Sequence, residues 1–442
     1  MRIDHLLLKN FKNFESQEFQ FHPEFNLIVG MNGAGKTSVL DALSIAAGSW
    51  FLGISDADAK SRHIQPNEIT LKRHIHTETD ADGSQSINTS WQRLYPCSVT
   101  ATGEINAQRL TWTRDKYSDN GRTQSKNARD IKLLSEAAFK CIGTDSKLPL
   151  LSYYGTGRLW QEPRDNYRVS DPQKISKKQN QTRLAGYRTS IDPRLSVTEL
   201  TRWIARQSWI SYQKKSSDHP IFKAVKAAML NCLDDASDID FDAELGEVVI
   251  TRTADCQPFS NLSDGQRCML ALVGDIAQKA ATLNPQLGSR VLQETEGVVL
   301  IDELDLHLHP KWQRRLVDDL RNTFPKIQFI CTTHSPFLIQ AIRSSDELIM
   351  LDGQPLTSLD NKSINEIAKG VQNIENPEVS LRYEAMKSSA KSYLEQLEQA
   401  DELPENQLEQ FKQALAEGIA PYADNAAFQA FLEMKRVAKI GE

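Results

Sequence analysis

A glycine-rich stretch near the start of the chain, GMNGAGKTS, has the residue types and spacing of a phosphate-binding loop. It fits the pattern G-x-x-x-x-G-K-[ST], with Gly30, Gly35, Lys36 and Thr37 at the fixed positions. Glycines let backbone N–H groups turn toward an anion, and the start of the following helix adds partial positive charge. Lys36 is therefore expected to reach the outer phosphates of a nucleotide, and the Thr37 hydroxyl to bind Mg²⁺. The predicted nucleotide-binding residues of this loop are Asn32, Gly33, Ala34, Gly35, Lys36, Thr37 and Ser38.

Two carboxylates end a later apolar stretch, GVVLIDE. At the carboxyl end of a central parallel strand, side chains face the crevice where ligands bind. Asp302 is therefore expected to hold the Mg²⁺ shell, and Glu303 to act as the general base on an attacking water. Taken alone, the pair could equally be a solvated strand end. The phosphate-loop pattern upstream favours the catalytic interpretation.

Histidines follow two of the predicted strands. His334 ends FICTTHSPF, where it is expected to contact the terminal phosphate and its attacking water. His307 and His309 form an H-x-H pair that could suggest a metal site, but further ligands at metal-site spacing are missing. We expect these two side chains to lie in a turn that faces a neighbouring subunit.

The segment LSDGQR precedes an apolar run of helical spacing. Ser263 and Gln266 have the spacing of a capping box, which starts many helices that have no function in binding. Gly265 also places a residue without a side chain at a helix N-terminus, where a phosphate could approach. From the residues alone, both interpretations stay open.

The surrounding pattern predicts the elements that position these residues. Residues 260–353 alternate between apolar strands and amphipathic helices, which predicts a parallel sheet with helices on its faces. Residues 56–150 contain strand-like pieces and a probable hairpin loop, DADGSQS. From Asn361 onward the chain is predicted to be helical, with breaks near Pro377, Pro404 and Pro421.

Composition narrows the class of protein. The 442 residues carry a net charge of -6, which argues against a globally basic nucleic-acid-binding protein. No run of 18 apolar residues occurs, and the N-terminus lacks the features of a signal peptide, so we expect a cytoplasmic chain without membrane contact. The cysteines have no CxxC spacing and are expected to be buried free thiols.

One segment, residues 156–216, is locally basic, with 13 Lys and Arg against 5 Asp and Glu. A charge run of this kind is usually a solvated face, but aromatic residues among the cations make DNA contact a second possibility. The residues that carry this hypothesis are Arg158, Trp160, Arg164, Tyr167, Arg168, Lys174, Lys177, Lys178, Arg183, Tyr187 and Arg188.

The motifs GMNGAGKTS, LSDGQR, VVLIDE and TTHSP occur in the order found in ABC-type ATPase heads, and the chain resembles the SMC/RecF-like branch of that family. The resemblance implies ATP and Mg²⁺ as ligands and a head-to-tail dimer in which Ser263, Gly265 and Gln266 contact the ATP of the other subunit. The family's dimer-facing aspartate is replaced by His309. Gln161 is the only candidate for its glutamine loop, so hydrolysis is expected to be slow or conditional.

A finer resemblance, carried by LPLLSYYGTGRLW, IDELDLHLHPKWQRRL and SINEIAKG, is to a group of bacterial ATPases that includes the PtuA subunits of Septu anti-phage defence. It implies a partner HNH nuclease, PtuB-like. An internal nuclease is not expected, because residues 340–442 contain no Asp-x-Asp pair. The alternatives are an SMC/RecF-like DNA repair or loading ATPase without a nuclease, and a scaffold that binds ATP without hydrolysing it.

These inferences predict an α/β fold: an ABC-ATPase head with a parallel-rich central sheet flanked by helices, an antiparallel β lobe and a C-terminal helical region. The head is assigned to residues 1–155 and 217–355, a basic insertion to 156–216 and a partner-binding region to 356–442. In that last region an apolar stripe either covers the head or binds the partner. Its members are Leu381, Met386, Tyr393, Leu394, Leu397, Phe411, Leu415, Phe428, Phe431 and Leu432.

Overall fold

The computed structural model describes residues 1–55, 59–79, 85–141, 146–158, 183–214, 219–253, 255–351, 362–372, 374, 376–398, 413, 422 and 425–440. The chain divides into two compact units, Met1–Ile367 and Ala368–Glu442. The first unit contains every residue that the sequence assigns to a nucleotide site.

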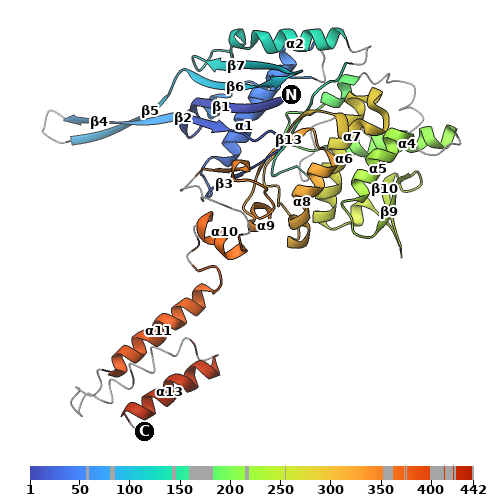
Figure 1. The fold of residues 1–442 in the computed structure, drawn as a ribbon. Helices are drawn as coiled ribbons and strands as arrows, with labels where there is room; N and C mark the ends of the chain where they lie inside the picture. The colour runs from blue at the N-terminus through green and yellow to red at the C-terminus, as the bar shows by residue number, and fades with distance from the viewer. Residues whose placement is uncertain are drawn as a thin grey trace. The chain divides into compact units, whose positions relative to one another are not determined.

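A five-stranded sheet forms the centre of the first unit (Figure 1). Its strand order is β14 (Leu348–Met350), β3 (Phe25–Val29), β13 (Ile327–Thr332), β12 (Gly297–Ile301) and β8 (Leu150–Tyr154), and all neighbours are parallel. The four strands other than β14 are buried along their whole length. Continuous apolar sequence is what a parallel strand covered on both faces requires. The predicted parallel sheet is therefore confirmed.

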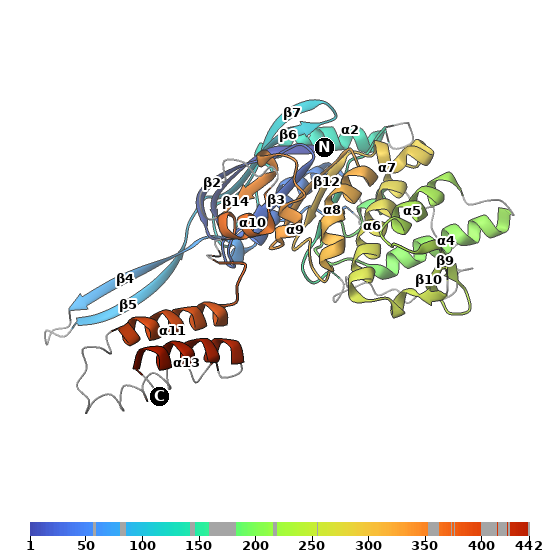
Figure 2. The same cartoon turned by 60° about the horizontal axis from the view of Figure 1, so that its bottom comes forward.

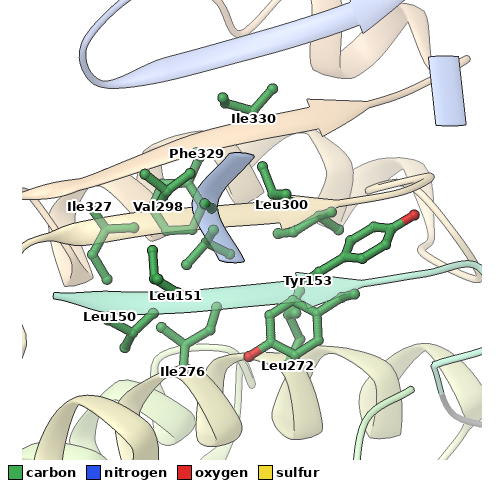
Figure 3. Close-up of a cluster of buried hydrophobic side chains, with 14 of the residues drawn as sticks. Leu150, Leu151, Tyr153, Leu272, Ile276, Val298, Leu300, Ile327, Phe329 and Ile330 are labelled. Atoms are coloured by element: carbon green, nitrogen blue, oxygen red, sulfur yellow. The ribbon is translucent and has the colours of Figure 1, made fainter. Parts of the chain in front are cut away.

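Helices cover the two faces of this sheet. Helix α1 (Lys36–Ala47) packs against β12 and β13, and also against strands of the antiparallel sheet described below. Helix α6 (Asp264–Leu283) packs against β8, where Leu272 and Ile276 meet the apolar side chains of the strand (Figure 3). These layers share one continuous hydrophobic core.

Three smaller sheets surround the core, and all are antiparallel. The predicted β lobe is a four-stranded sheet whose inner face covers α1, and the Trp112 indole donates to the carbonyl of Ala46 over 2.9 Å. Its strand order is β2 (Phe14–Gln20), β1 (Arg2–Phe11), β6 (Cys97–Ile105) and β7 (Gln108–Lys116). The others are the ribbon β4 (Leu71–Thr79) with β5 (Gln85–Arg93), and the sheet β11 (Cys256–Pro258), β10 (Glu247–Arg252) and β9 (Ala236–Asp242).

The remaining helices of the first unit lie around these sheets. Figure 2 shows α4 (Val197–Lys214) and α5 (Pro220–Leu230) beside α6 and the β9–β10 pair. The others are α2 (Arg129–Lys140), α7 (Val291–Glu294), α8 (Pro310–Thr323) and α9 (Pro336–Ile339). Helix α10 (Ile364–Gly370) spans the boundary between the two units.

The second unit contains α11 (Leu381–Glu398) and α13 (Ala426–Ile440), which pack against each other. Tyr393, Leu397 and Leu432 are buried between them, so these three members of the apolar stripe pack against one another. Leu381 does not share this role, because 84% of it is exposed, and Phe431 is 46% exposed. Phe411 and Leu415 lie outside the described residues.

The structure tests two expectations from composition, on membrane-spanning helices and on the cysteines. Among the described residues, no helix combines the length and the hydropathy that crossing a membrane requires. All six cysteines are free, but the expectation that they are all buried is wrong for Cys141 and Cys256, which are exposed.

Candidate nucleotide-binding site

The glycine loop joins β3 to α1 in the order that its motif predicts. Gly33 and Gly35 have φ values of 86° and 105°, a left-handed backbone that glycine adopts without strain. A Cβ on Gly35 would also lie 2.6 Å from the Asn13 amide nitrogen. The N-cap residue Gly35 has no side chain that could cap α1, which leaves its first-turn N–H groups suited to an anion.

Lys36 is buried and bends back over the loop. Its ammonium donates to the carbonyls of Gly30 and Met31 over 2.8 and 3.0 Å. The cationic head is thus held at the loop itself, where a phosphate would exchange these carbonyl contacts for stronger charge-assisted hydrogen bonds.

The carboxyl ends of β3, β12 and β13 meet at one edge of the sheet, because the three strands are parallel neighbours. There the Thr37 hydroxyl donates to Asp302 Oδ2 over 2.8 Å. The Thr332 hydroxyl donates to the other carboxylate oxygen, Oδ1, over 2.6 Å. Residues 265 positions apart in sequence are therefore brought together, as the motif order predicted.

This pair of oxygen groups is suited to a magnesium ion. Mg²⁺ prefers oxygen ligands, and it is commonly held by one or two protein groups together with phosphate oxygens and waters. The Thr37 hydroxyl is on an exposed residue, and the Asp302 carboxylate lies directly behind it. The two residues fit the ion that the sequence predicts.

Glu303 stands next to this pair in an unusual backbone conformation. Its φ is 48°, and its N–H donates to the Thr332 hydroxyl over 2.7 Å. The side chain is half-buried, and no described residue forms a hydrogen bond or ion pair with its carboxylate. A carboxylate without a protein partner beside the phosphate loop is able to accept a proton from water.

His334 follows β13 at the same edge and is exposed. The residues on either side of it fix the local backbone. The Thr333 hydroxyl donates to Asp305 Oδ1 over 2.6 Å, and the Ser335 hydroxyl caps α9 while donating to Gln313 Oε1 over 2.6 Å. The loop that carries His334 is thereby tied to the turn after β12.

At the start of α6, the capping box anticipated from the sequence is confirmed. Ser263 Oγ accepts the N–H of Gln266, and Gln266 Oε1 accepts the N–H of Ser263 over 3.2 Å. Gly265 is buried, and a Cβ there would lie 2.6 Å from the His307 carbonyl oxygen. Only glycine lets this helix approach so closely to the turn that follows β12.

The signature residues do not join the phosphate loop of their own chain. Every hydrogen bond of Ser263 goes to the first turn of α6, and the residue is exposed. Its hydroxyl therefore remains accessible to a ligand from outside the chain.

Two residues that contact the candidate site were not assigned to it from the sequence. Arg158 has no exposed surface, and its guanidinium donates to the carbonyls of Asp302 and Glu303. Tyr153 donates to Asp41 Oδ1 of α1 over 3.2 Å. Both residues belong to the stretch YYGTGR. The sequence signal that could have identified Arg158 is an arginine that follows a buried strand and two glycines.

The hypothesis of an exposed basic surface is wrong for three of its members. Arg158 and Tyr187 are fully buried, and the Tyr187 hydroxyl accepts the Trp50 indole N–H. Arg183 is half-buried and donates to the Leu283 carbonyl over 2.7 Å. Arg188 pairs with a glutamate of α4. Trp160, Arg164, Tyr167, Arg168, Lys174, Lys177 and Lys178 lie outside the described residues, as does Gln161.

The H-x-H pair lies where the sequence placed it, in the turn between β12 and α8. His307 and His309 are exposed, and His309 Nδ1 caps α8 by accepting the N–H of Lys311 over 3.2 Å. Within the described part of the chain, no group of three or more His, Cys, Asp or Glu residues could hold a metal ion.

The fold and the site define the class of protein: this is an ABC-type P-loop ATPase head. Its features are a phosphate loop, a Thr–Asp pair suited to magnesium, an adjacent glutamate and a glycine-containing signature segment, all on a parallel sheet with an antiparallel β lobe. The chain belongs to the RecF/RecN/SMC N terminal domain family, whose model matches residues 2–354. The resemblance to SMC/RecF-like ATPases is thereby confirmed.

Individual relatives extend this assignment. The Retron Ec83 probable ATPase of Escherichia coli is 23% identical over 414 residues, covering 80% of this chain and 72% of the relative. The Retron Vc95 probable ATPase of Vibrio cholerae is 26% identical, covering 78% and 72%. The Septu protein PtuA of Bacillus mycoides is 35% identical over 133 residues, which cover 30% of this chain and 18% of that protein.

Proposed function

We propose that this chain binds and hydrolyses ATP as a head-to-tail dimer whose nucleotide state controls a partner HNH nuclease. The observation that carries the ATPase part is the 2.8 Å contact between Thr37 and Asp302 at the end of the phosphate loop. This contact supports Thr37 and Asp302 as the residues that would hold Mg²⁺. Bound Mg²⁺ supplies neutralisation of the phosphate charge.

The hydrolytic step is an in-line attack of water on the γ-phosphorus of ATP. As the water oxygen bonds to phosphorus, the bond from phosphorus to the β–γ bridging oxygen breaks, and ADP leaves with the electron pair. Glu303 accepts the proton that the water loses. Lys36 and the N–H groups of α1 stabilise the charge that develops on the phosphoryl oxygens, and His334 senses the terminal phosphate.

The dimer rests on the signature segment. Ser263 is exposed and all its hydrogen bonds stay in α6, while the missing side chain of Gly265 lets the helix start lie against the His307 carbonyl. These features support a second chain's ATP as the ligand of Ser263, Gly265 and Gln266. A partner that prefers either the closed or the open dimer is then controlled by nucleotide.

The variant Glu303→Gln tests this dimer. With the general base removed, ATP is bound but not cleaved, so Glu303→Gln should sediment as a dimer with ATP and as the smaller species without it. The double variant that adds Lys36→Ala should not respond to ATP. A Glu303→Gln protein whose mass in solution is the same with and without ATP would contradict the proposed dimer.

The nuclease partner is supported by the likeness to PtuA, which is limited to part of the chain. We propose that the partner binds the region 356–442 and that the protein acts in the cytoplasm in defence against phage. Co-expression with a neighbouring HNH protein, followed by sizing and plasmid cleavage with and without ATP, tests this. Cleavage that needs the complex and changes with ATP is the expected result.

The second candidate is a DNA repair or loading ATPase without a nuclease, which the likeness of part of the chain to DNA replication and repair protein RecF supports. It predicts ATP turnover by the isolated chain that DNA stimulates, with no co-purifying nuclease. Residues 156–216 remain our proposed DNA contact, now restricted to positions other than Arg158, Arg183 and Tyr187.

A further inference from the structure

A single buried arginine connects the two halves of the proposed catalytic unit. Arg158 Nη1 donates to the Asp302 carbonyl over 2.7 Å, and Nη2 donates to the Glu303 carbonyl over 3.0 Å. On its other side, Nε donates to the Cys268 thiol sulfur over 3.4 Å. Cys268 lies in the first turns of α6, directly after the signature residues. One side chain thus contacts both the turn after β12 and the signature helix.

The chemical nature of this contact is unusual for a buried cation. Arg158 has no exposed surface, and no carboxylate among the described residues pairs with it. Burying a guanidinium without a counter-charge costs free energy, so such groups persist where their fixed fork of donors is needed. Here every acceptor is a backbone carbonyl or the thiol of α6.

The backbone that Arg158 holds is itself strained. Glu303 has φ 48°, and the left-handed conformation is unfavourable for a residue with a side chain. Two groups oppose the relaxation of Glu303: the Thr332 hydroxyl, which accepts its N–H, and Arg158, which binds its carbonyl. The direction of the Glu303 side chain follows from this backbone conformation.

We propose that Arg158 is a positioning residue that holds Glu303 in its left-handed conformation and couples that conformation to the signature helix α6. This inference rests on the proposed function, because α6 is expected to move when it engages the ATP of a second chain. The movement reaches Glu303 through the guanidinium, and the water-orienting carboxylate takes its working position only in the engaged dimer. Hydrolysis is thereby limited to assembled protein.

The experiment compares Arg158→Lys with Arg183→Lys in the full chain. Lysine keeps the charge but loses the fork of donors. Arg183 is a matched control, because it also donates to backbone carbonyls but lies away from Glu303. We expect Arg158→Lys to lower kcat about 10–100-fold, since small misplacements of a catalytic group have effects of this size, with KM for ATP changed less than about twofold. Arg183→Lys should keep wild-type kcat.

Two further readouts separate positioning from a general loss of structure. Because Arg158 acts through Glu303, the double variant of Arg158→Lys and Glu303→Gln should be no slower than Glu303→Gln alone. Hydrogen exchange with ATPγS should show protection of residues 263–270 and 302–306 in the wild type. In Arg158→Lys, protection of 263–270 should remain and that of 302–306 should fall.

Each outcome decides between named alternatives. If Arg158→Lys matches Arg183→Lys in kcat and in exchange, the coupling is refuted while the ATPase proposal stands. If the wild type shows neither turnover nor nucleotide-dependent protection, the proposed function fails and the coupling fails with it. If Arg158→Lys does not fold, Cys268→Ala carries the test: it removes only the α6 contact and should reproduce the loss of protection at 302–306.

Discussion

Tyr153 and Tyr154, adjacent on β8, donate hydrogen bonds to aspartates on opposite sides of the central sheet. Tyr153 bonds Asp41 of α1 over 3.2 Å, and Tyr154 bonds Asp275 of α6 over 2.7 Å. Successive side chains of a strand point to opposite faces, so one dipeptide reaches both the phosphate-loop helix and the signature helix. The edge strand β8 therefore fixes the positions of both nucleotide-binding helices.

The stability of the protein should depend on the negative charge of Asp275, the aspartate on the α6 side of the sheet. Asp275 also pairs with Lys279 over 2.8 Å, and both are buried. Asp275→Asn leaves the Lys279 ammonium without its carboxylate, which should reduce stability by about 3–5 kcal/mol. Tyr154→Phe removes one hydrogen bond to a charged group and should cost about 2 kcal/mol. Thermal melting should rank these variants in that order.

Tyr212→Phe is the control for this series, because 77% of Tyr212 is exposed and its substitution should leave the melting temperature unchanged. Burial and the nearby Asp275 both raise the pKa of Tyr154, so its hydroxyl stays a donor throughout the neutral range. An Asp275→Asn variant with the same melting temperature as the wild type would contradict the stabilising role of the Asp275–Lys279 ion pair.

Lys36→Ala should weaken ATP binding about a hundredfold. Charge-assisted hydrogen bonds contribute about 1.5–3 kcal/mol, and a tenfold change in affinity corresponds to about 1.4 kcal/mol. Equilibrium titration with a fluorescent ATP analogue measures this change. Lys9→Ala, an exposed lysine on β1, is the control and should bind like the wild type. Unchanged affinity in Lys36→Ala would remove the phosphate loop from the binding site.

Thr332 can be tested with a pair of variants that differ in one group. Thr332→Val removes the hydroxyl that accepts the Glu303 N–H and donates to Asp302, leaving that buried N–H unpaired. We expect kcat to fall at least about tenfold, which corresponds to about 1.4 kcal/mol. Thr332→Ser keeps the hydroxyl and should retain most activity. Equal rates for the two variants would show that the hydroxyl and its hydrogen bonds do not govern the rate.

Gly265→Ala should block engagement of the dimer without weakening ATP binding to the single chain. A Cβ at Gly265 meets the His307 carbonyl, a backbone atom that cannot rotate away. Gly274→Ala in the same helix is the matched control, since a Cβ there meets the flexible side chains of Leu200 and Met229. In the Glu303→Gln background, light scattering with ATP should detect dimers for Gly274→Ala and far fewer for Gly265→Ala.

The cysteines should divide into two reactivity classes. Cys141 and Cys256 are exposed and should react with a thiol reagent in the native protein, whereas Cys97, Cys232, Cys268 and Cys331 are buried and should react only after unfolding. Burial raises the pKa of Cys97 and of Cys232 to about 12, so few thiolates form there even at mildly alkaline pH. Fast labelling of more than two thiols at pH 8 would contradict the described burial.

Much of this architecture follows from local sequence patterns. Strands β3, β12 and β13 were predictable because continuous apolar runs bounded by glycine or charge have few alternatives. The placement of Asp302 beside Thr37 was predictable because the phosphate-loop motif fixes its residue types and its position between a strand and a helix.

Other features depended on contacts between distant segments. The burial of Arg158 follows from the meeting of α6 with the turn after β12, and neither periodicity nor composition near residue 158 contains that information. For the same reason a basic residue in a basic stretch was expected at the surface. The left-handed conformation of Glu303 is likewise imposed by Thr332 and Arg158 rather than by its own neighbours in sequence.

The pairing of β3 with β13 and β14 has a consequence for folding during synthesis. The strand that supports the phosphate loop is synthesised well before both of its neighbours in the sheet, which belong to residues 327–350. At translation rates of about 5–20 residues per second, β3 must wait on the order of tens of seconds for its neighbours. We therefore expect the phosphate loop of a nascent chain to gain its affinity for ATP only after residues 327–350 have been made.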